Sequence, residues 1–385
     1  MEKNILRRMR MTATVLGAAL IACSLPAAAF AATPPMAHTE EEWAHLRDNA
    51  LEWYEIEDLI HEYNATVLKN REELSKDERR NMDAEKVRDY LLDEADDMDS
   101  LADSADSAMV SATYRTQANS LRSQADSNVT DYEVIKLDYE VIEKNLFRTA
   151  QNLFISYYSA QAKKAGAEAG VAYLERAYAS AVNRKNAGMA TELDVLTAQE
   201  SLENARASLV ADETEIRTSF NNLQVLCGWS YDSMAEIGPL PEIDPNSFAG
   251  IDPDADLNTA LSSSYTLRID EIKLKNARSL YPGQVEQYES QLASDTNSFK
   301  VAFRGAYDSL MNAALSYKNA QSDHALKAQD LGAAQRKLGL GLISQIEYEG
   351  VQNELAAAQT AEQTAYYGMI SAKAAYDAAV RGIVQ

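Results

Sequence analysis

Histidines and glycine motifs are the first residues to test for catalytic or metal-binding chemistry. None of the histidines has a second histidine at i, i+4 or cysteine partners, the spacings typical of zinc sites. The glycines of Gly339-Leu-Gly341 lack the third glycine and the preceding strand of a dinucleotide-binding turn, and no Gly-x-Ser-x-Gly is present. The four histidines are His38, His45, His61 and His324. We therefore expect no enzyme, no metal site and no cofactor, and interpret His324 as a packed or pore-facing polar residue.

The acidic run from Asp93 to Asp106 is the other candidate for metal chemistry. An EF-hand loop needs a glycine at its sixth position and a glutamate at its twelfth. This run contains no glycine, so we interpret it as the solvated face of a helix rather than a calcium loop.

The chain has two cysteines, Cys23 and Cys227. Cys23 lies in the N-terminal targeting segment, so one thiol is left in the mature chain and no internal disulfide can form. Cys227 follows Val-Leu at an apolar helix end, where a small buried hydrophobic residue is expected.

Two short motifs predict where helices end and restart. Gly188 suits the left-handed position after a helix C-terminus, and Thr191 with Asp194 has the spacing of a capping box that starts the next helix. Gly341, Ser344 and Glu347 repeat these offsets 153 residues later. Two such units in the same register indicate an internal duplication.

The flanking sequence extends this duplication. Apolar residues alternate in steps of four and three from Leu146 to Ala181, and again at the same offset from Phe299 to Ala334. Such a sustained 3.5-residue period is typical of a left-handed coiled-coil seam. Only three seam positions are polar: Lys164, His324 and Lys327.

Glycine and proline are scarce, with 15 and 8 copies in 385 residues, which favours long helices over sheet. The apolar pattern predicts helices throughout the chain. Their expected ranges are 41–74, 84–126, 131–187, 191–227, 254–281, about 284–338, and from 344 to near the C-terminus.

The N-terminal segment reads as a signal peptide. A basic start and an apolar core from Thr12 to Ala22 precede Ala29-Phe30-Ala31, a small-x-small cleavage site. Leu20-Ile21-Ala22-Cys23 also resembles a lipobox, so lipid attachment at Cys23 stays open.

The expected divisions are 1–31 signal peptide, 32–227 first helical repeat, 228–253 linker rich in proline and glycine, and 254–385 second helical repeat. We therefore expect an exported cell-envelope protein.

The net charge of −23 argues against nucleic acid as a partner. Loss of the basic leader makes the mature chain more acidic. The charge keeps a long helical surface solvated and favours a basic partner.

These motifs resemble those of the TolC-like outer-membrane efflux family. Gly188-Met-Ala-Thr-Glu-Leu-Asp-Val-Leu and Gly341-Leu-Ile-Ser-Gln-Ile-Glu-Tyr match its helix-turn-helix pattern, and Asp256-Leu-Asn-Thr-Ala-Leu261 is similar to the opening of its second half. The resemblance implies a homotrimer that forms a hollow α-helical barrel. It also implies that the turns dock onto a periplasmic adaptor protein of an export pump with an ABC-type or similar inner-membrane transporter.

The chain departs from that family at two joins. Members of the family usually carry a β-hairpin in each half, yet neither Asp126–Asp131 nor Pro282-Gly283 shows a strand pattern. The predicted fold is all-α, with long antiparallel coiled-coil hairpins in two tandem repeats, as in a TolC-like α-helical barrel protomer without a membrane β-barrel. By resemblance the protein belongs in the outer membrane, while a periplasmic or extracellular-face location stays open.

Two functions follow as expectations. The first is an efflux or secretion component that forms an extracytoplasmic helical conduit and docks onto an adaptor. The alternative is a coiled-coil envelope scaffold without a transport role. Apolar residues in both reversals suggest a partner, although they could also only staple the helices together. The expected adaptor contacts are Gly188, Met189, Ala190, Thr191, Gly341, Leu342, Ile343 and Ser344.

Overall fold

A computed structural model describes residues 38–231 and 233–384; the signal segment and Cys23 lie outside these residues. Within the described part, the strands are two short ones, β1 (Ala50–Leu51) and β2 (Glu236–Ile237). They pair in parallel, with Ala50 opposite Glu236, and so tie the start of the first half to the segment after it. The remaining elements are helices, which confirms the predicted fold class.

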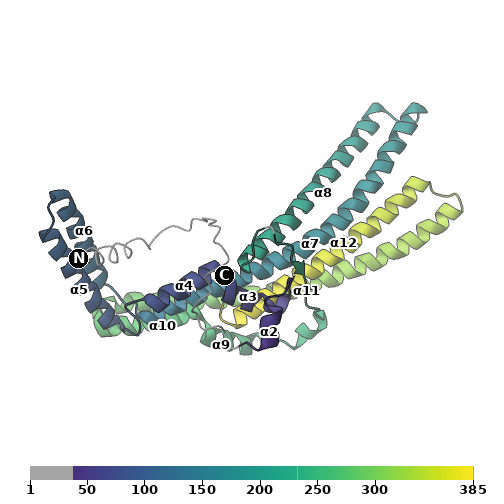
Figure 1. Cartoon of the computed structure of the whole chain (residues 1–385). Coiled ribbons are helices and arrows are strands. Elements are labelled where there is room, and N and C mark those ends of the chain that lie inside the picture. Colours follow the sequence, from purple (N-terminus) through teal and green to yellow (C-terminus); the bar gives the residue numbers. More distant parts are fainter. Residues whose placement is uncertain (1–37, 232, 385) are drawn as a thin grey trace. The chain divides into compact units, whose positions relative to one another are not determined.

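The two predicted long hairpins are present. Their helices are α7 (Tyr132–Asn186) with α8 (Glu192–Leu226), and α11 (Val285–Gly339) with α12 (Gln345–Val380). The longer helix of each hairpin has 55 residues and therefore extends about 80 Å. Figure 1 shows the two hairpins side by side.

The continuous helix predicted for residues 41–74 is wrong. The chain instead forms α2 (Glu40–His45), β1, the 3-10 helix η1 (Trp53–Glu55), α3 (Ile56–Tyr63) and α4 (Ala65–Lys76). Asn64 causes the last break, because its extended backbone ends α3 while its side chain accepts the N–H groups of Thr66 and Val67. The same side chain donates to the Leu226 carbonyl at 2.8 Å, a tertiary contact that local periodicity does not encode.

The single helix predicted for residues 84–126 is also wrong. It folds back on itself as α5 (Ala84–Asp103) and α6 (Ala108–Ala125), joined by residues 104–107. Ala95 and Met98 of α5 pack against Ala118 of α6. The alternating apolar positions of this stretch therefore face each other across a hairpin, which we call the α5–α6 hairpin.

The second half repeats the pair of short helices and the long hairpin of the first half, but it has one turn of 3-10 helix where the first half has α5 and α6. It consists of η2 (Pro245–Gly250), α9 (Pro253–Ser263), α10 (Tyr265–Leu280), η3 (Pro282–Gln284) and the second long hairpin. Ser264 breaks α9 from α10 and caps the Leu267 N–H, as Asn64 does between α3 and α4. The single helix predicted over 254–281 is thus divided in two for the same reason.

Two glycines in left-handed conformation mark equivalent close approaches. Gly228 (φ +84°) follows α8 and passes so close to Tyr63 that a Cβ would overlap its backbone. Gly382 (φ +85°) follows α12 and has the same relation to the Ser263 carbonyl. The duplication therefore includes the packing of each short helix pair against the end of its long hairpin.

The long helices pack in the order α8, α7, α12, α11, so that α7 contacts both α8 and α12 (Figure 1). One buried cluster surrounds Phe154 of α7 and includes the short N-terminal elements. A second surrounds Phe303 of α11 and includes α9 and the end of α12. A second face of α7, besides the one against α8, is thus partly covered within the chain by α12.

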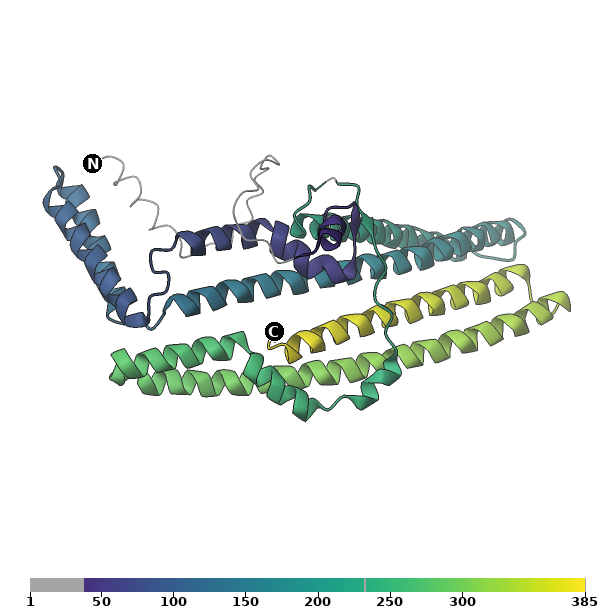
Figure 2. The ribbon, with the colours of Figure 1, turned by 60° about the horizontal axis from the view of Figure 1, so that its bottom comes forward.

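The two joins singled out from the sequence differ from each other. Asp126–Asp131 is a short connection between α6 and α7, and Pro282–Gln284 is one turn of 3-10 helix between α10 and α11. The α5–α6 hairpin lies at the end of α7 opposite the Gly188 turn (Figures 1 and 2). A search of the described residues for a membrane-crossing helix, judged by length and apolar character, finds none.

Candidate functional site

Each long hairpin ends in a tight reversal, which we call tip 1 (residues 187–191) and tip 2 (residues 340–344). Gly188 and Gly341 have φ values of +74° and +69°. At tip 1 the Met189 N–H donates to the Arg184 carbonyl at 2.7 Å, and at tip 2 the Leu342 N–H donates to Lys337 at 2.9 Å. These six-residue closures satisfy helix-end carbonyls and require the left-handed glycine.

The helix that follows each tip begins with a complete capping box. Asp194 accepts the Thr191 N–H at 2.7 Å and Glu347 accepts the Ser344 N–H at 2.7 Å, while the two hydroxyls accept the return N–H bonds. These backbone hydrogen bonds lower the pKa of both carboxyls. The two tips are therefore built by the same local chemistry and have a fixed geometry.

The tips expose large apolar side chains. Met189 is 66% exposed and Leu342 is 69% exposed, whereas Ala190 and Ile343 are half-buried. Leu193 and Leu340 are also exposed, at 71% and 74%. The adaptor contacts expected from the sequence did not include these two leucines, because they were limited to the four residues of each reversal and both leucines lie just outside.

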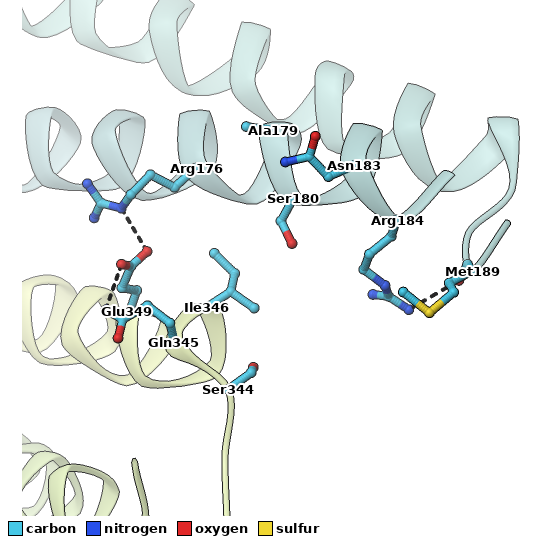
Figure 3. Close-up of a pocket in the computed structure, with 10 residues that line it drawn as sticks. All are labelled: Arg176, Ala179, Ser180, Asn183, Arg184, Met189, Ser344, Gln345, Ile346 and Glu349. Atoms are coloured by element: carbon cyan, nitrogen blue, oxygen red, sulfur yellow. Dashed lines mark hydrogen bonds and ion pairs between the residues drawn. The ribbon is translucent and has the colours of Figure 1, made fainter. Parts of the chain in front are cut away.

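A groove of about 530 Å³ lies between α7 and α12 near the tips (Figure 3). Arg176 Nε donates to Glu349 Oε2 at 2.8 Å from one wall to the other. Gln345 donates to the second oxygen of Glu349 at 2.9 Å. The hydrogen bond from Gln345, together with the hydrogen bond and charge of Arg176, lowers the pKa of Glu349. Met189 and Ser344 bring one residue of each tip to the groove.

The polar residues of the seams each meet a glutamate on the facing helix. Lys164 of α7 lies 3.1 Å from Glu213 of α8, which raises the pKa of the lysine. In the second hairpin, His324 Nδ1 lies 2.5 Å from Glu362 and Lys327 Nζ lies 2.7 Å from Glu354. Pairing explains why these side chains are tolerated between coiled helices.

The described residues offer little for metal binding or for thiol chemistry. In residues 38–231 and 233–384, no three metal-ligating side chains of His, Cys, Asp or Glu gather in one place. Cys227 is fully buried, and burial raises the pKa of its thiol to about 12, so the thiol stays protonated at neutral pH. The tips are therefore the most distinctive surface for function.

Part of the chain matches the model of a known protein family. Residues 88–229 match the family model described as outer membrane efflux protein. None of the curated protein sequences matches the chain.

Solved structures that resemble this chain share little sequence with it. The outer membrane protein VceC from Vibrio cholerae is 11% identical, with a TM-score of 0.50 over 86% of this chain and 96% of VceC. The Campylobacter jejuni CmeC outer membrane channel is 11% identical, with a TM-score of 0.46 over 70% of this chain and 67% of CmeC. A membrane protein from Pseudomonas aeruginosa is 16% identical, with a TM-score of 0.46 over 68% of this chain and 71% of that protein. In sequence over residues 88–229, and in fold over most of its length, this chain is similar to the TolC-like outer membrane efflux proteins.

Proposed function

We propose that this protein is an efflux or secretion component whose copies form an extracytoplasmic helical conduit and dock onto an adaptor protein. The observation that carries the proposal is the pair of tips. Both have the same cap chemistry and both expose large apolar residues where no core of the chain covers them. Apolar groups kept on a rigid exposed end favour a partner.

The edges of the helical layer support assembly into a ring. At one edge, α11 exposes Val301, Leu315 and Leu326, whose spacing places them on one side of that helix. At the other edge, α8 exposes Leu196 and Val210. Contact between α8 of one copy and α11 of the next would cover both edges and close into a ring, which we propose is a homotrimer.

The partner at the tips fits an adaptor of an export pump driven by an ABC-type or similar inner-membrane transporter. An adaptor side chain could enter the groove beside Met189 and Ile346, between walls that already hold the Arg176–Glu349 ion pair. The acidic surface of the chain favours a basic partner surface. This role places the protein in the cell envelope.

Charge substitutions at the tips test the docking step. Met189→Asp combined with Leu342→Asp should leave helicity and assembly unchanged, because both side chains are exposed. Binding to an adaptor-type envelope protein of the native host should weaken more than about tenfold, as expected when central apolar contacts are replaced by charge. The measurement is co-purification after cross-linking, together with export.

Met234→Asp is the matched control, since Met234 is 84% exposed but lies in the segment between the halves. It should leave adaptor binding intact. Adaptor binding that survives both tip substitutions would show that the tips only staple their helices and would overturn the docking proposal.

The second candidate is an envelope scaffold that uses its coiled coils for assembly alone. The ion pairs across both seams would serve that role equally well. Export lost in the tip variant while the assembly stays intact would favour transport, whereas a loss of assembly without any effect on export would favour the scaffold.

A further inference from the structure

The α5–α6 hairpin is a feature of the first half alone. It is inserted between α4 and α7, at the place where the second half passes from α10 to α11 through η3. It points away from the start of α7 (Figures 1 and 2). Its own buried core is small, with Ala95, Met98 and Ala118 as the buried members of the cluster between the helices.

The hairpin separates its charges between its two helices. α5 is strongly acidic, and its side away from α6 carries Asp89, Asp93 and Ser100. The 18 residues of α6 include no acid. The two arginines of α6 point back to α5, where Arg122 lies 2.7 Å from Asp96 and from Asp99 and Arg115 lies 3.3 Å from Asp103.

The opposite face of α6, which we call the α6 outer face, is uncharged and uncovered. Met109 at its start is 80% exposed, and Val110 beside it is 44% exposed. Thr113 and Thr116 donate their hydroxyl protons to carbonyls four residues earlier in the same helix. Their hydroxyls are therefore satisfied locally and their methyl groups are available for packing.

The α6 outer face also has the spacing of a helix seam. Its exposed residues alternate in steps of three and four, the pattern by which helices from separate chains interlock. These residues are Met109, Ala112, Thr116, Asn119 and Ser123. A face with this spacing and no charge can be buried without desolvating an ion.

We propose that the α6 outer face is a subunit interface, where α6 packs against α6 of other copies of this chain while acidic α5 faces water. The charge distribution of the hairpin favours α6 of another copy as the partner of this face and favours an orientation in which α5 faces water. Contact between α5 helices would bring like charges together, and contact of α6 with α5 would bury aspartates against an uncharged face. The inference rests on the homotrimer proposed above, in which three α6 helices meet around the symmetry axis.

A matched pair of cysteine variants tests this arrangement. Ser120→Cys places a thiol on the α6 outer face, and Ser100→Cys places one on the outer side of α5; both serines are exposed. Under mild oxidation of the purified assembly, S120C should form disulfide-linked dimers at least about tenfold more than S100C, because a disulfide needs Cα atoms within about 7 Å. Both variants keep the buried native thiol of Cys227, so it contributes equally to the two results.

A second substitution keeps the test independent of one side chain. Thr116→Glu in the S120C background would bring carboxylates together at the interface and should suppress the cross-link, while Ser100→Glu in that background should not. Equal cross-linking of S120C and S100C, or no cross-linking of S120C, would overturn the inference. If the protein is a trimer by light scattering in that case, the proposed conduit stands and only the α6 interface is wrong; a monomer would overturn both.

Discussion

At the scale of single residues, the seams between the long helices accommodate three polar side chains because a glutamate on the facing helix pairs with each of them. Lys164, His324 and Lys327 stand out as polar residues on an apolar seam. Their glutamate partners lie between 27 and 49 residues away along the chain, and their identity depends on the register of two antiparallel helices. Local spacing does not fix that register, so only the structure could show that each exception is paired.

Asp270 is a residue-scale feature that has no signature in the sequence. It lies on α10 close to Asp295 of α11, and burial, helped by the neighbouring carboxyl, raises its pKa to about 6. The pKa in the folded protein is thus above that of the unfolded chain. Its protonated form stabilises the folded state at low pH, and this contribution is lost as the pH rises through about 6.

Asp270→Asn should therefore stabilise the protein above pH 6 and have little effect near pH 4. We expect the thermal midpoint at pH 7.5 to rise by roughly 1–2 °C, since partial exposure screens the repulsion. Circular dichroism melts between pH 4 and 8 measure this. Asp308→Asn, at an exposed position of α11, is the control and should change the thermal midpoint little at any pH. If the shift caused by Asp270→Asn is also the same at every pH, the raised pKa of Asp270 is contradicted.

At the scale of elements, the strong local signals predicted the long helices and both tips. Runs without breakers, a glycine after the last turn and a capping box are local features, and they locate α7, α8, α11 and α12 to within a few residues. The short helices could not be predicted in this way. Their ends depend on Asn64 and Ser264, and Asn64 bonds to the Leu226 carbonyl of a distant helix.

Glycine substitutions distinguish helix ends that pack against another part of the chain from helix ends at the exposed tips. Gly228→Ala and Gly382→Ala each put a Cβ in a left-handed conformation and into a neighbouring backbone, so each should cost more than about 2 kcal/mol. Gly188→Ala and Gly341→Ala meet nothing within 4 Å, so each should cost only the conformational term of about 1–2 kcal/mol for an alanine in left-handed conformation.

Thermal melts followed by helical circular dichroism measure these losses. Gly250→Ala is the control, because its backbone is not left-handed and nothing lies within 4 Å of the added Cβ. If Gly228→Ala melts with the same midpoint as Gly188→Ala, then the close packing of α3 on the end of α8 does not contribute to the stability of the fold.

At the scale of the whole molecule, the sequence showed a duplication but not how its halves pack. The repeat made two hairpins, yet α7 uses one face for α8 and another for α12. That choice depends on side chains of both halves at once, such as Tyr158, which stacks on Phe154 of its own helix and contacts Tyr367 of α12. Among the long helices, this packing leaves the outer sides of α8 and α11 uncovered, and the proposed ring would bring these two edges together.

The ring proposal makes a definite prediction for these edges. Leu315 of α11 and Val210 of α8 are 58% and 62% exposed in the single chain, so Leu315→Glu and Val210→Glu should not disturb its folding. In a ring each would place an unpaired carboxylate inside an apolar subunit contact, which costs several kcal/mol at every interface. Light scattering at micromolar concentration should therefore show the mass fall from trimer to monomer in either variant, with helicity unchanged.

Met234→Glu, on an exposed side chain of the segment between the halves rather than on the long helices α8 and α11, should keep the mass of the trimer. Because a head-to-tail ring uses both edges at every contact, either substitution alone should be as disruptive as the two together. If only Leu315→Glu dissociates the assembly, α11 must pack on α11 of another copy. Such a self-complementary contact closes at two subunits, so this outcome would replace the proposed trimer with a dimer.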